Sequence, residues 1–361
     1  MQLSCTFCSG ISRVKSVVAG DGSVVAGIGP ELTRIAIVRS LPGLGDLLCA
    51  VPAWRALRAA LPEAQVTLIG LPWARSFVER YAAYLDRFQE FPGYPGIPEV
   101  SPLIRQLPAF FTSVQEEGFD LALQMHGSGI VTNSFTVMLG ARVNAGFYLP
   151  GHYCPDPDRF LPYPANEPEV WRHLRLMEFL GIPLKGAELE FPLWEEDFWV
   201  LRNIDAVRDL QDGEYVCVHP GASTCDRRWS PKKFAVVADA LAARGFQVVL
   251  TGTAAEAELT QAVRESMREQ PIDLAGRTNV GAIAALLSHA RLLVCNDTGV
   301  SHLAAALQVK SVVIFSASDS NRWAPLDRDR HRVVGGSKGR EELSISPDAV
   351  LAEVEYLLSL E

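Results

Sequence analysis

The sequence predicts an α/β protein made of two doubly wound, Rossmann-like domains that face a central cleft. Short apolar runs alternate with stretches of helical periodicity twice, first from Arg34 onward and again from Tyr215. A proline-rich segment at residues 149–170 interrupts this rhythm between the two halves. The length of 361 residues is sufficient for two cores. Alternation of this kind with short connections is typical of parallel sheets that are covered on both faces.

The first half of the chain divides into an N-terminal extension, residues 1–33, and a first domain, residues 34–190. The extension is rich in Gly, Ser and Val without periodicity, so we expect it to lie outside the first core. The segment 149–170 is expected to be an irregular loop, and residues 189–199 to cross to the second domain. Strands are predicted at residues 35–38, 66–69 and 121–125, with helices at 46–61, 72–81, 103–117, 131–139 and 169–180.

The second domain, residues 191–345, is predicted to contain five strands and four helices, and residues 346–361 a C-terminal helix. Ser230 and Pro231 have the residue types favoured at the N-cap and first position of a helix. The expected strands are 215–219, 247–250, 272–274, 292–295 and 311–315, and the helices are 231–244, 254–267, 280–289 and 298–307, with 347–360 at the end.

Composition and charge exclude several classes of protein. The net charge of −9 argues against a nucleic-acid binder, which would carry a basic face. No apolar run approaches the roughly 18 residues that cross a bilayer, and the N-terminus lacks the pattern of a signal peptide. The seven cysteines are scattered, as is typical of reduced thiols. These features predict a cytoplasmic protein.

Residues 294–306 carry the clearest functional signal. An apolar strand ends in Asn-Asp-Thr-Gly and passes at once into helical spacing, so the first amides of that helix can hold an anion near Thr298 and Gly299. Asp297 can accept hydrogen bonds from hydroxyls. Phosphate with hydroxyls is the outline of a nucleotide-sugar. His302, one turn on, can donate to a phosphate, although a buried structural histidine is the slightly favoured interpretation from sequence alone.

Two further loops of the second domain have groups that suit such a ligand. Ser223 and Thr224 follow a strand and can form a nest of amides, and Arg227 can clamp a diphosphate. The competing interpretation leaves one of the two adjacent arginines in solvent and stacks the other on Trp229. In the next loop, Gly252 permits close approach and Glu256 can accept from ribose hydroxyls; a simple helix-dipole role for Glu256 competes. We expect Arg227 and Glu256 to bind ligand.

The first domain offers a carboxylate at the start of its first helix. Gly43 and Gly45 let backbone approach a ligand closely, and Asp46 is either a catalytic carboxylate or a helix N-cap, with near-even odds from spacing. Gln124 and His126 end a strand on the same side and are predicted to contact a second substrate. The loop is not a dinucleotide fingerprint because Leu48 stands where a third glycine would be needed.

These motifs, in this order, resemble the heptosyltransferase family, glycosyltransferase family nine. The resemblance covers nearly everything from Arg34 onward. It is carried by GLGD at 43–46, LP at 61–62, HPGAS at 219–223 with RRW at 227–229, LTGT at 250–253 with Glu256, DLAGR at 273–277, and NDTG at 296–299 with His302.

The resemblance implies a GT-B fold and inverting, metal-independent transfer of a sugar, typically from ADP-heptose, onto lipopolysaccharide core. It implies that Asp46 is the catalytic base and that Glu256 binds ribose. Arg227 falls where the family has a diphosphate-binding lysine, a departure that keeps the charge and changes the geometry. It implies that Asp297, Thr298 and Gly299 bind the donor sugar and its phosphates, and that His302 is the histidine that follows them in the family.

The expected partners are a nucleotide-sugar donor and a glycan or glycolipid acceptor, with peripheral contact at the inner face of the cytoplasmic membrane, and no cofactor or metal. The Asp156-Pro-Asp158 sequence mimics a metal-binding DxD, but it lies in a proline-rich loop. Two alternatives stay open: a sugar-nucleotide epimerase of the same architecture, and a non-catalytic nucleotide-sugar-binding homologue. An NAD-dependent dehydrogenase ranks last.

Overall fold

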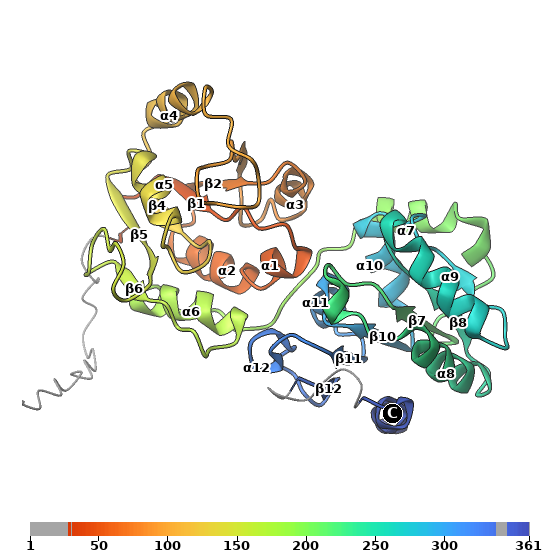
Figure 1. Cartoon of the computed structure of the whole chain (residues 1–361). Coiled ribbons are helices and arrows are strands. Elements are labelled where there is room, and N and C mark those ends of the chain that lie inside the picture. Colours follow the sequence, from red (N-terminus) through yellow and green to blue (C-terminus); the bar gives the residue numbers. More distant parts are fainter. Residues whose placement is uncertain (1–27, 30, 337–344, 361) are drawn as a thin grey trace, which may run out of the picture.

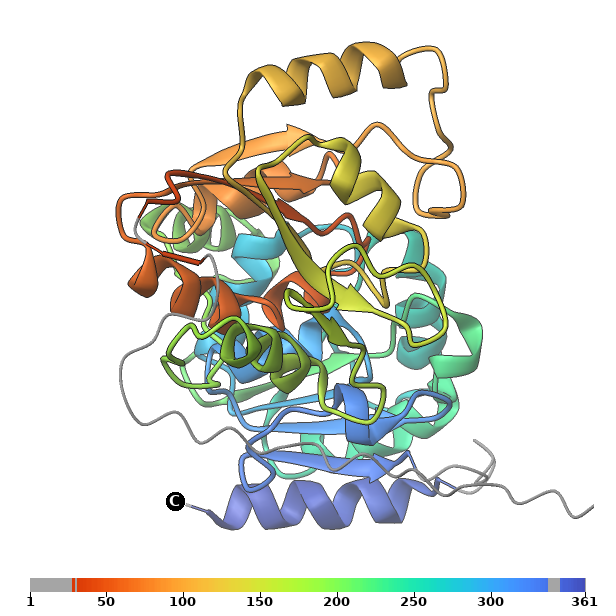
Figure 2. The same cartoon turned by 90° about the vertical axis from the view of Figure 1, so that its left-hand side faces the viewer.

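The computed structural model describes residues 28–29, 31–336 and 345–360, and it consists of two lobes. Each lobe contains one six-stranded parallel sheet with helices on both faces (Figure 1). The predicted architecture of two doubly wound halves is therefore confirmed. The helix nearest one end of the molecule is α4 (Leu107–Glu116), and α13 (Pro347–Ser359) lies at the opposite end (Figure 2).

The first sheet has the order β3-β2-β1-β4-β5-β6. The strand order reverses between β1 and β4, and in doubly wound sheets ligands bind at this switch point. Asp46 lies in the first helix after β1, and His126 lies in the loop that follows β4. The strands are β1 (Arg34–Val38), β2 (Gln65–Gly70), β3 (Arg87–Glu90), β4 (Leu121–Gln124), β5 (Val143–Tyr148) and β6 (Phe160–Pro162); the other helices are α1 (Leu44–Leu48), α2 (Val51–Ala60), α3 (Ala74–Arg80), α5 (Thr132–Met138) and α6 (Glu169–Phe179).

The second sheet has the order β12-β11-β10-β7-β8-β9, with its switch point between β7 and β10. The loops after these two strands carry Arg227 and Asp297. The strands are β7 (Tyr215–His219), β8 (Gln247–Leu250), β9 (Ile272–Asp273), β10 (Leu292–Asn296), β11 (Ser311–Phe315) and β12 (His331–Gly335). The helices are α7 (Glu195–Arg202), α8 (Pro231–Ala242), α9 (Ala257–Ser266), α10 (Val280–Ser288), α11 (Gly299–Ala306) and α12 (Ser320–Trp323), with 3-10 turns at Asp205–Val207, Cys225–Arg227 and Ala254–Glu256.

Alternation along the buried strands divides the core between the two faces of each sheet. On β1, Ile35 and Ile37 pack on one face toward α2, and Ala36 and Val38 pack on the other with residues of α4 and α5. The cluster on the α2 face continues into the second lobe, where it includes residues of α10 and α11. One apolar core thus runs through both lobes and holds them together.

The chain crosses between the lobes in the segment 180–194. Helix α6 packs on α2 in the first lobe, and α7 packs on α10 in the second. Arg80 of α3 pairs with both carboxylate oxygens of Asp197 on α7, at 2.7 and 2.8 Å. This bidentate pair fixes the first lobe to the second beside the crossing.

The predicted helix 46–61 is two helices, and the break has a clear cause. The guanidinium of Arg39 donates hydrogen bonds to the carbonyl of Asp46, the group to which the amide of Ala50 would donate in a continuous helix. The amide of Ala50 donates to the carbonyl of Leu47 instead. Pro52 has no amide hydrogen to continue the first ladder. The helical ladder therefore stops after Leu48 and restarts at Val51.

Other expectations need correction at sheet edges and at the N-terminus. The second sheet has six strands, not five, because β12 was not predicted, and the segment 149–170 is not wholly irregular because it contains β6. Ile28 and Leu32 are buried in the main core, so the extension 1–33 does not lie wholly outside it; residues 1–27 fall outside the described part of the chain. Within that part, no helix is both long and apolar enough to cross a bilayer.

Candidate functional site

Three loops of the second lobe meet at the carboxyl edge of its sheet, because they follow the neighbouring strands β10, β7 and β8. Asn296, at the end of β10, ties two of them together. Its side-chain oxygen accepts from the amide of Trp229 at 3.0 Å, and its amide group donates to the carbonyl of Pro220 at 2.8 Å. The predicted donor-binding residues after β7 and β10 are therefore held side by side.

Arg227 and Asp297 face each other across these loops. Nη1 of Arg227 lies 3.8 Å from Oδ2 of Asp297, and this oxygen is buried without a hydrogen-bond partner. Arg228 instead donates to the carbonyl of Ala222 in its own loop. Neither arginine stacks on Trp229, since the cation over that ring is Lys233. Arg227 is thus the arginine directed at the predicted anion site.

The remaining donor-side residues surround this pair. Ser223 and Thr224 are exposed on the loop after β7, and Thr224 precedes the 3-10 turn Cys225–Arg227. Thr298 is the N-cap residue of α11 with extended backbone, and its side chain makes no capping hydrogen bond. Gly299 begins the helix. The first amides of α11 and the hydroxyl of Thr298 are the groups that the predicted phosphate site would use.

Glu256 both caps its own turn and reaches a second loop. Its Oε2 accepts from the amide and the hydroxyl of Thr253, at 2.8 and 2.9 Å, which is a local capping role that was not predicted. Its other oxygen lies against Gly221, where a Cβ would stand only 2.1 Å away. Gly252 lies beneath the Glu256 side chain, whose Cβ is 3.4 Å from the position of a Cβ on that glycine. No hydrogen bond from a described residue reaches Oε1 of Glu256, so its binding of a ligand stays a prediction.

Asp46 is the third residue of α1, and the helix N-cap is Gly43. Among the residues that the structure describes, none donates a hydrogen bond to the Asp46 carboxylate. Asp46 therefore does not cap the helix. Oδ2 lies 2.4 Å from the position that a Cβ on Gly43 would take, so any other residue at 43 would displace the carboxylate. Burial raises the pKa of Asp46, and Glu169 adds to this while Arg39, His302 and Arg322 oppose it. A raised pKa suits a general base.

The two lobes touch where α1 meets α11. His302 of α11 is buried against Gly45, and its Nδ1 lies 3.5 Å from Sγ of Cys49. Burial lowers the pKa of His302, although Asp297, Asp46 and Glu169 favour its charged form. His302 is thus buried at the contact between the lobes, and its binding of a donor phosphate stays a prediction. Asp46 and the start of α11 come together through this contact.

The predicted contacts of Gln124 and His126 with a second substrate need correction. Gln124 is fully buried, donates to the carbonyl of His126 and to Thr132, and accepts from the amide of Phe147. It has no free group for a ligand. His126 is nearly buried, with Nδ1 against Ser40 and Nε2 3.4 Å from Glu99. His126 thus contacts the loop after β1 through Ser40, and Gln124 ties β4 to β5 and to α5.

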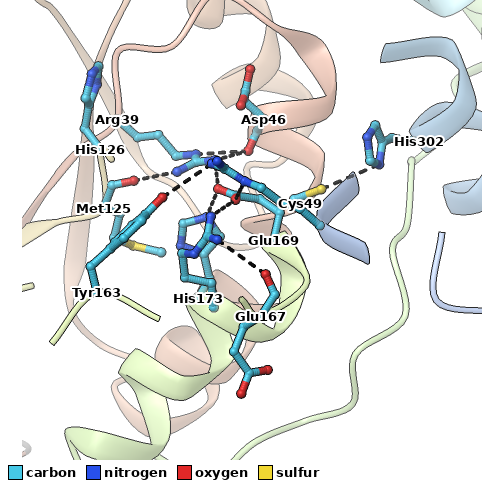
Figure 3. Close-up of polar contacts among 12 residues, drawn as sticks. Arg39, Asp46, Cys49, Met125, His126, Tyr163, Glu167, Glu169, His173 and His302 are labelled. Atoms are coloured by element: carbon cyan, nitrogen blue, oxygen red, sulfur yellow. Dashed lines mark hydrogen bonds and ion pairs between the residues drawn. The ribbon is translucent and has the colours of Figure 1, made fainter. Parts of the chain in front are cut away.

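Sequence reasoning missed a buried ionic cluster beside Asp46 (Figure 3). Its centre is Glu169 of α6, whose carboxylate meets Arg39, Arg172 and His173 of the first lobe and Arg322 of the second. Burial lowers the pKa of His173 to about 4, so it is neutral near pH 7. Burial of Glu169 opposes its ionisation, but contact with His173 and the charges of Arg39 and Arg172 outweigh this and hold its pKa well below the usual range. The sequence did contain one signal of this cluster: a charged residue, Arg39, stands directly after the apolar run of β1.

Metal-binding side chains do not gather in the described ranges: no group of three or more His, Cys, Asp or Glu there is placed to hold an ion. Asp156, from the DxD-like sequence, instead pairs with Arg159 and accepts from the amide of Asp158 at 2.9 Å. A cavity of about 350 Å³ does lie between the lobes, and Glu169, His302 and Arg322 are among its lining residues.

Comparison with known proteins agrees with the motifs. The sequence model described as "Glycosyltransferase family 9 (heptosyltransferase)" matches residues 108–345. Lipopolysaccharide heptosyltransferase 2 of Salmonella typhimurium is 30% identical over 356 residues, covering 88% of this chain and 97% of that protein. Lipopolysaccharide heptosyltransferase 3 of Escherichia coli (strain K12) is 31% identical over 206 residues, which are 52% of this chain and 59% of that protein. In the latter match the chain spans little more than half of its relative.

Solved structures share the fold. A glycosyl transferase family 9 protein from Veillonella parvula superposes with a TM-score of 0.75 at 20% identity, covering 93% of this chain and 99% of that one. The ADP-heptose lps heptosyltransferase II of E. coli gives 0.72 at 21% identity, with 90% and 98% covered. The E. coli heptosyltransferase WaaC with ADP-2-deoxy-2-fluoro heptose gives 0.64 at 19% identity, with 90% and 99% covered. These likenesses show that the two lobes form a GT-B fold.

Proposed function

This chain belongs to glycosyltransferase family 9, and we propose that it transfers a sugar, a heptose in the first instance, from a nucleotide-sugar to a lipopolysaccharide-type or other glycan acceptor. The observation that carries the proposal is the contact of α1 with α11. It packs α1, the helix that carries Asp46, against the helix start that follows Asp297. ADP-heptose is the proposed donor, because WaaC of the same fold is described with an ADP-heptose analogue.

In the proposed reaction, Asp46 removes the proton of an acceptor hydroxyl as that oxygen attacks the anomeric carbon. Attack comes from the face opposite the diphosphate, so the anomeric configuration is inverted. The new glycosidic C–O bond forms as the bond to the diphosphate breaks, and the nucleoside diphosphate leaves with the electron pair. General-base assistance of this kind is worth roughly 10²–10⁴ in rate.

The leaving diphosphate needs fixed positive charge. Arg227, the amides at Ser223 and Thr224, and the amides at the start of α11 are the groups that we propose for this role, and they are positioned before reaction. Glu256 would bind the ribose through its free oxygen, and Asp297 the sugar hydroxyls. No metal ion is part of the proposal, and transfer should persist in EDTA.

We propose a cytoplasmic location, with peripheral contact at the inner membrane where a lipid-linked acceptor would reside. The rival epimerase activity is not separated from transfer by fold alone, since the UDP-GlcNAc 2-epimerase of Methanocaldococcus jannaschii shares the fold at a TM-score of 0.51 and 10% identity. Sequence similarity favours transfer, because the relatives found by sequence are heptosyltransferases.

The test is incubation of the full chain with a panel of ADP-, UDP- and GDP-sugars, read first as thermal stabilisation. The stabilising donor is then mixed with lipopolysaccharide truncated before its heptoses, and the products are weighed by mass spectrometry. We expect ADP-heptose to stabilise the protein and the acceptor to gain one heptose. An isomerised donor without acceptor would establish the epimerase instead, and stabilisation without any product would establish a binding protein.

A further inference from the structure

A single buried carboxylate joins the two lobes beside Asp46. Oε1 of Glu169, on α6 of the first lobe, lies 3.5 Å from Nη2 of Arg39, and Arg172 donates to its other oxygen. Arg322, on α12 of the second lobe, donates from Nε to the same Oε2 at 3.1 Å. Figure 3 shows Arg39 and His173 beside the Glu169 carboxylate. Cations from both sides of the domain interface therefore share one counter-charge.

Arg39 connects this carboxylate to the turn that carries Asp46. Its Nε and Nη2 donate to the backbone carbonyl of Asp46 at 2.9 and 2.6 Å, and its Nη1 donates to the carbonyl of Met125. The Asp46 carbonyl lies outside the helical ladder, since Ala50 bonds to Leu47. The first turn of α1 is thus oriented by the side chain of Arg39, the residue directly after β1. The Asp46 carboxylate points away from the cluster (Figure 3).

We propose that Glu169 is a positioning residue for Asp46, and that Arg322 is the contact through which the second lobe completes its arrangement. Glu169 fixes the guanidinium of Arg39, and Arg39 fixes the turn of α1. When the lobes separate, Arg322 leaves Glu169, and the turn loses part of its anchorage. The contact that joins the lobes therefore also aligns Asp46, the proposed base. This inference rests on the proposed function, in which Asp46 is the base.

The exposure of the partners shows which of them can move. The side chains of Arg39 and Arg172 are 0% and 1% exposed, and they also donate to backbone carbonyls of their own lobe. Arg322 is 35% exposed and lies at the edge of the interface. Glu169 keeps Arg39 and Arg172 when the lobes part, so Arg322 is the one arginine of the cluster whose contact depends on how the lobes are arranged.

The primary experiment compares Arg322→Met and Arg322→Lys in the full-length enzyme. Arg332→Met is the matched control, because Arg332 is 29% exposed and pairs with Glu353 within the second lobe. We expect Arg322→Met to lower kcat by about 10–10²-fold, as misplacement of a reacting group does, with the donor KM little changed. Arg322→Lys should recover part of kcat, and Arg332→Met should match the wild type.

A second readout does not depend on activity. Amide hydrogen exchange of residues 44–50 should become about tenfold faster in Arg322→Met, and the same segment should be unchanged in Arg332→Met. This measurement needs neither donor nor acceptor. It separates a failure of this inference from a failure of the proposed function, which would appear as a wild-type protein that transfers nothing.

The pH profile distinguishes positioning from general loss of structure. The charged and titratable groups that face Asp46 are Arg39, Glu169, His302 and Arg322. The charge of Arg322 lowers the pKa of Asp46 and that of Glu169 raises it. The acidic limb of kcat/KM should therefore move to higher pH in Arg322→Met and to lower pH in Glu169→Gln. A merely structural defect would not move the limb in opposite directions.

Normal kcat together with normal exchange of residues 44–50 in Arg322→Met would overturn the inference. If Glu169→Gln does not fold, the Arg322 variants test the inference without it. Arg322 lies at the edge of the interface, so its replacement leaves the core of the protein intact. Equal losses in Arg322→Met and Arg332→Met would also overturn it, because the effect would then be that of any lost surface ion pair.

Discussion

Gly45 of the first lobe and His302 of the second are in direct contact, and the contact leaves no space for a side chain. A Cβ on Gly45 would stand 2.5 Å from Cδ2 of His302. On the other side of the contact, a Cβ on Gly299 would stand 3.1 Å from Cβ of Leu44. One glycine from each lobe thus permits α1 and α11 to approach. This is how the chain brings its proposed base and its proposed phosphate site together.

Gly45→Ala should therefore separate the lobes. We expect a loss of about 1–3 kcal/mol in the free energy of unfolding, as overpacking a tight contact costs. The rate of transfer should fall more than donor affinity does, because the donor is proposed to bind on the second lobe alone. Calorimetric titration with ADP and steady-state kinetics measure the two effects. The double variant Gly45→Ala/His302→Ala should regain part of the stability; wild-type stability and turnover in Gly45→Ala alone would contradict this account of the interface.

Arg227→Met should weaken donor binding by about 10–100-fold, the range that corresponds to loss of a hydrogen bond to a charged group. Arg227→Lys should retain part of the affinity because it keeps the charge. Arg228→Met is the matched control, since Arg228 donates to its own loop. Titration of each variant with ADP measures the difference. Equal losses for the two arginines would show that Arg227 has no special role.

Gln124→Leu should act on stability and not on acceptor binding. The substitution leaves the buried amide of Phe147 without its acceptor, at a cost of about 1–3 kcal/mol. The acceptor KM should stay at its wild-type value in the fraction that remains folded. Chemical denaturation together with acceptor titrations tests both statements. A selective rise in acceptor KM would restore the contact that the sequence suggested.

Stability should fall as the pH decreases from about 6.5 to about 4. Burial lowers the pKa of His331 from 6.5 to about 4, so in this window the unfolded chain takes up a proton that the folded protein does not. The stabilisation is complete above pH 6.5 and is lost on acidification. His331→Gln should make the slope of the melting temperature against pH shallower. An unchanged slope would mean that His331 titrates normally in the folded protein.

The sequence was sufficient for the buried strands and for the loops that follow them. β1, β4, β7 and β10 are fully or almost fully buried, so their apolar runs are visible without coordinates. Edge strands give no such signal. β3 reads Arg-Phe-Gln-Glu and β12 is half-exposed along its length, so both were missed. β5 was missed because Asn144 and Gly146 interrupt its pattern.

At the candidate site, sequence reasoning identified residues whose neighbours along the chain explain them. Arg227 and Asp297 each follow a strand in a recognisable motif, and Asp46 lies in the first turn of the helix after β1. Glu169 and Arg322 were not identified, because their roles depend on contact between segments 153 residues apart. Gln124 was misassigned for a related reason: a polar residue at the end of a strand near a switch point is expected to face a ligand, and only the coordinates show that β5 covers it.

The most direct test of the central claim is the transfer rate of Asp46→Asn, measured beside its affinity for ADP. Asparagine preserves the size of the side chain and removes its ability to take a proton. We predict that kcat falls by about 10²–10⁴-fold, while the Kd for ADP stays within a few-fold of the wild-type value. Turnover close to that of the wild type would contradict the account, because the base would then lie elsewhere.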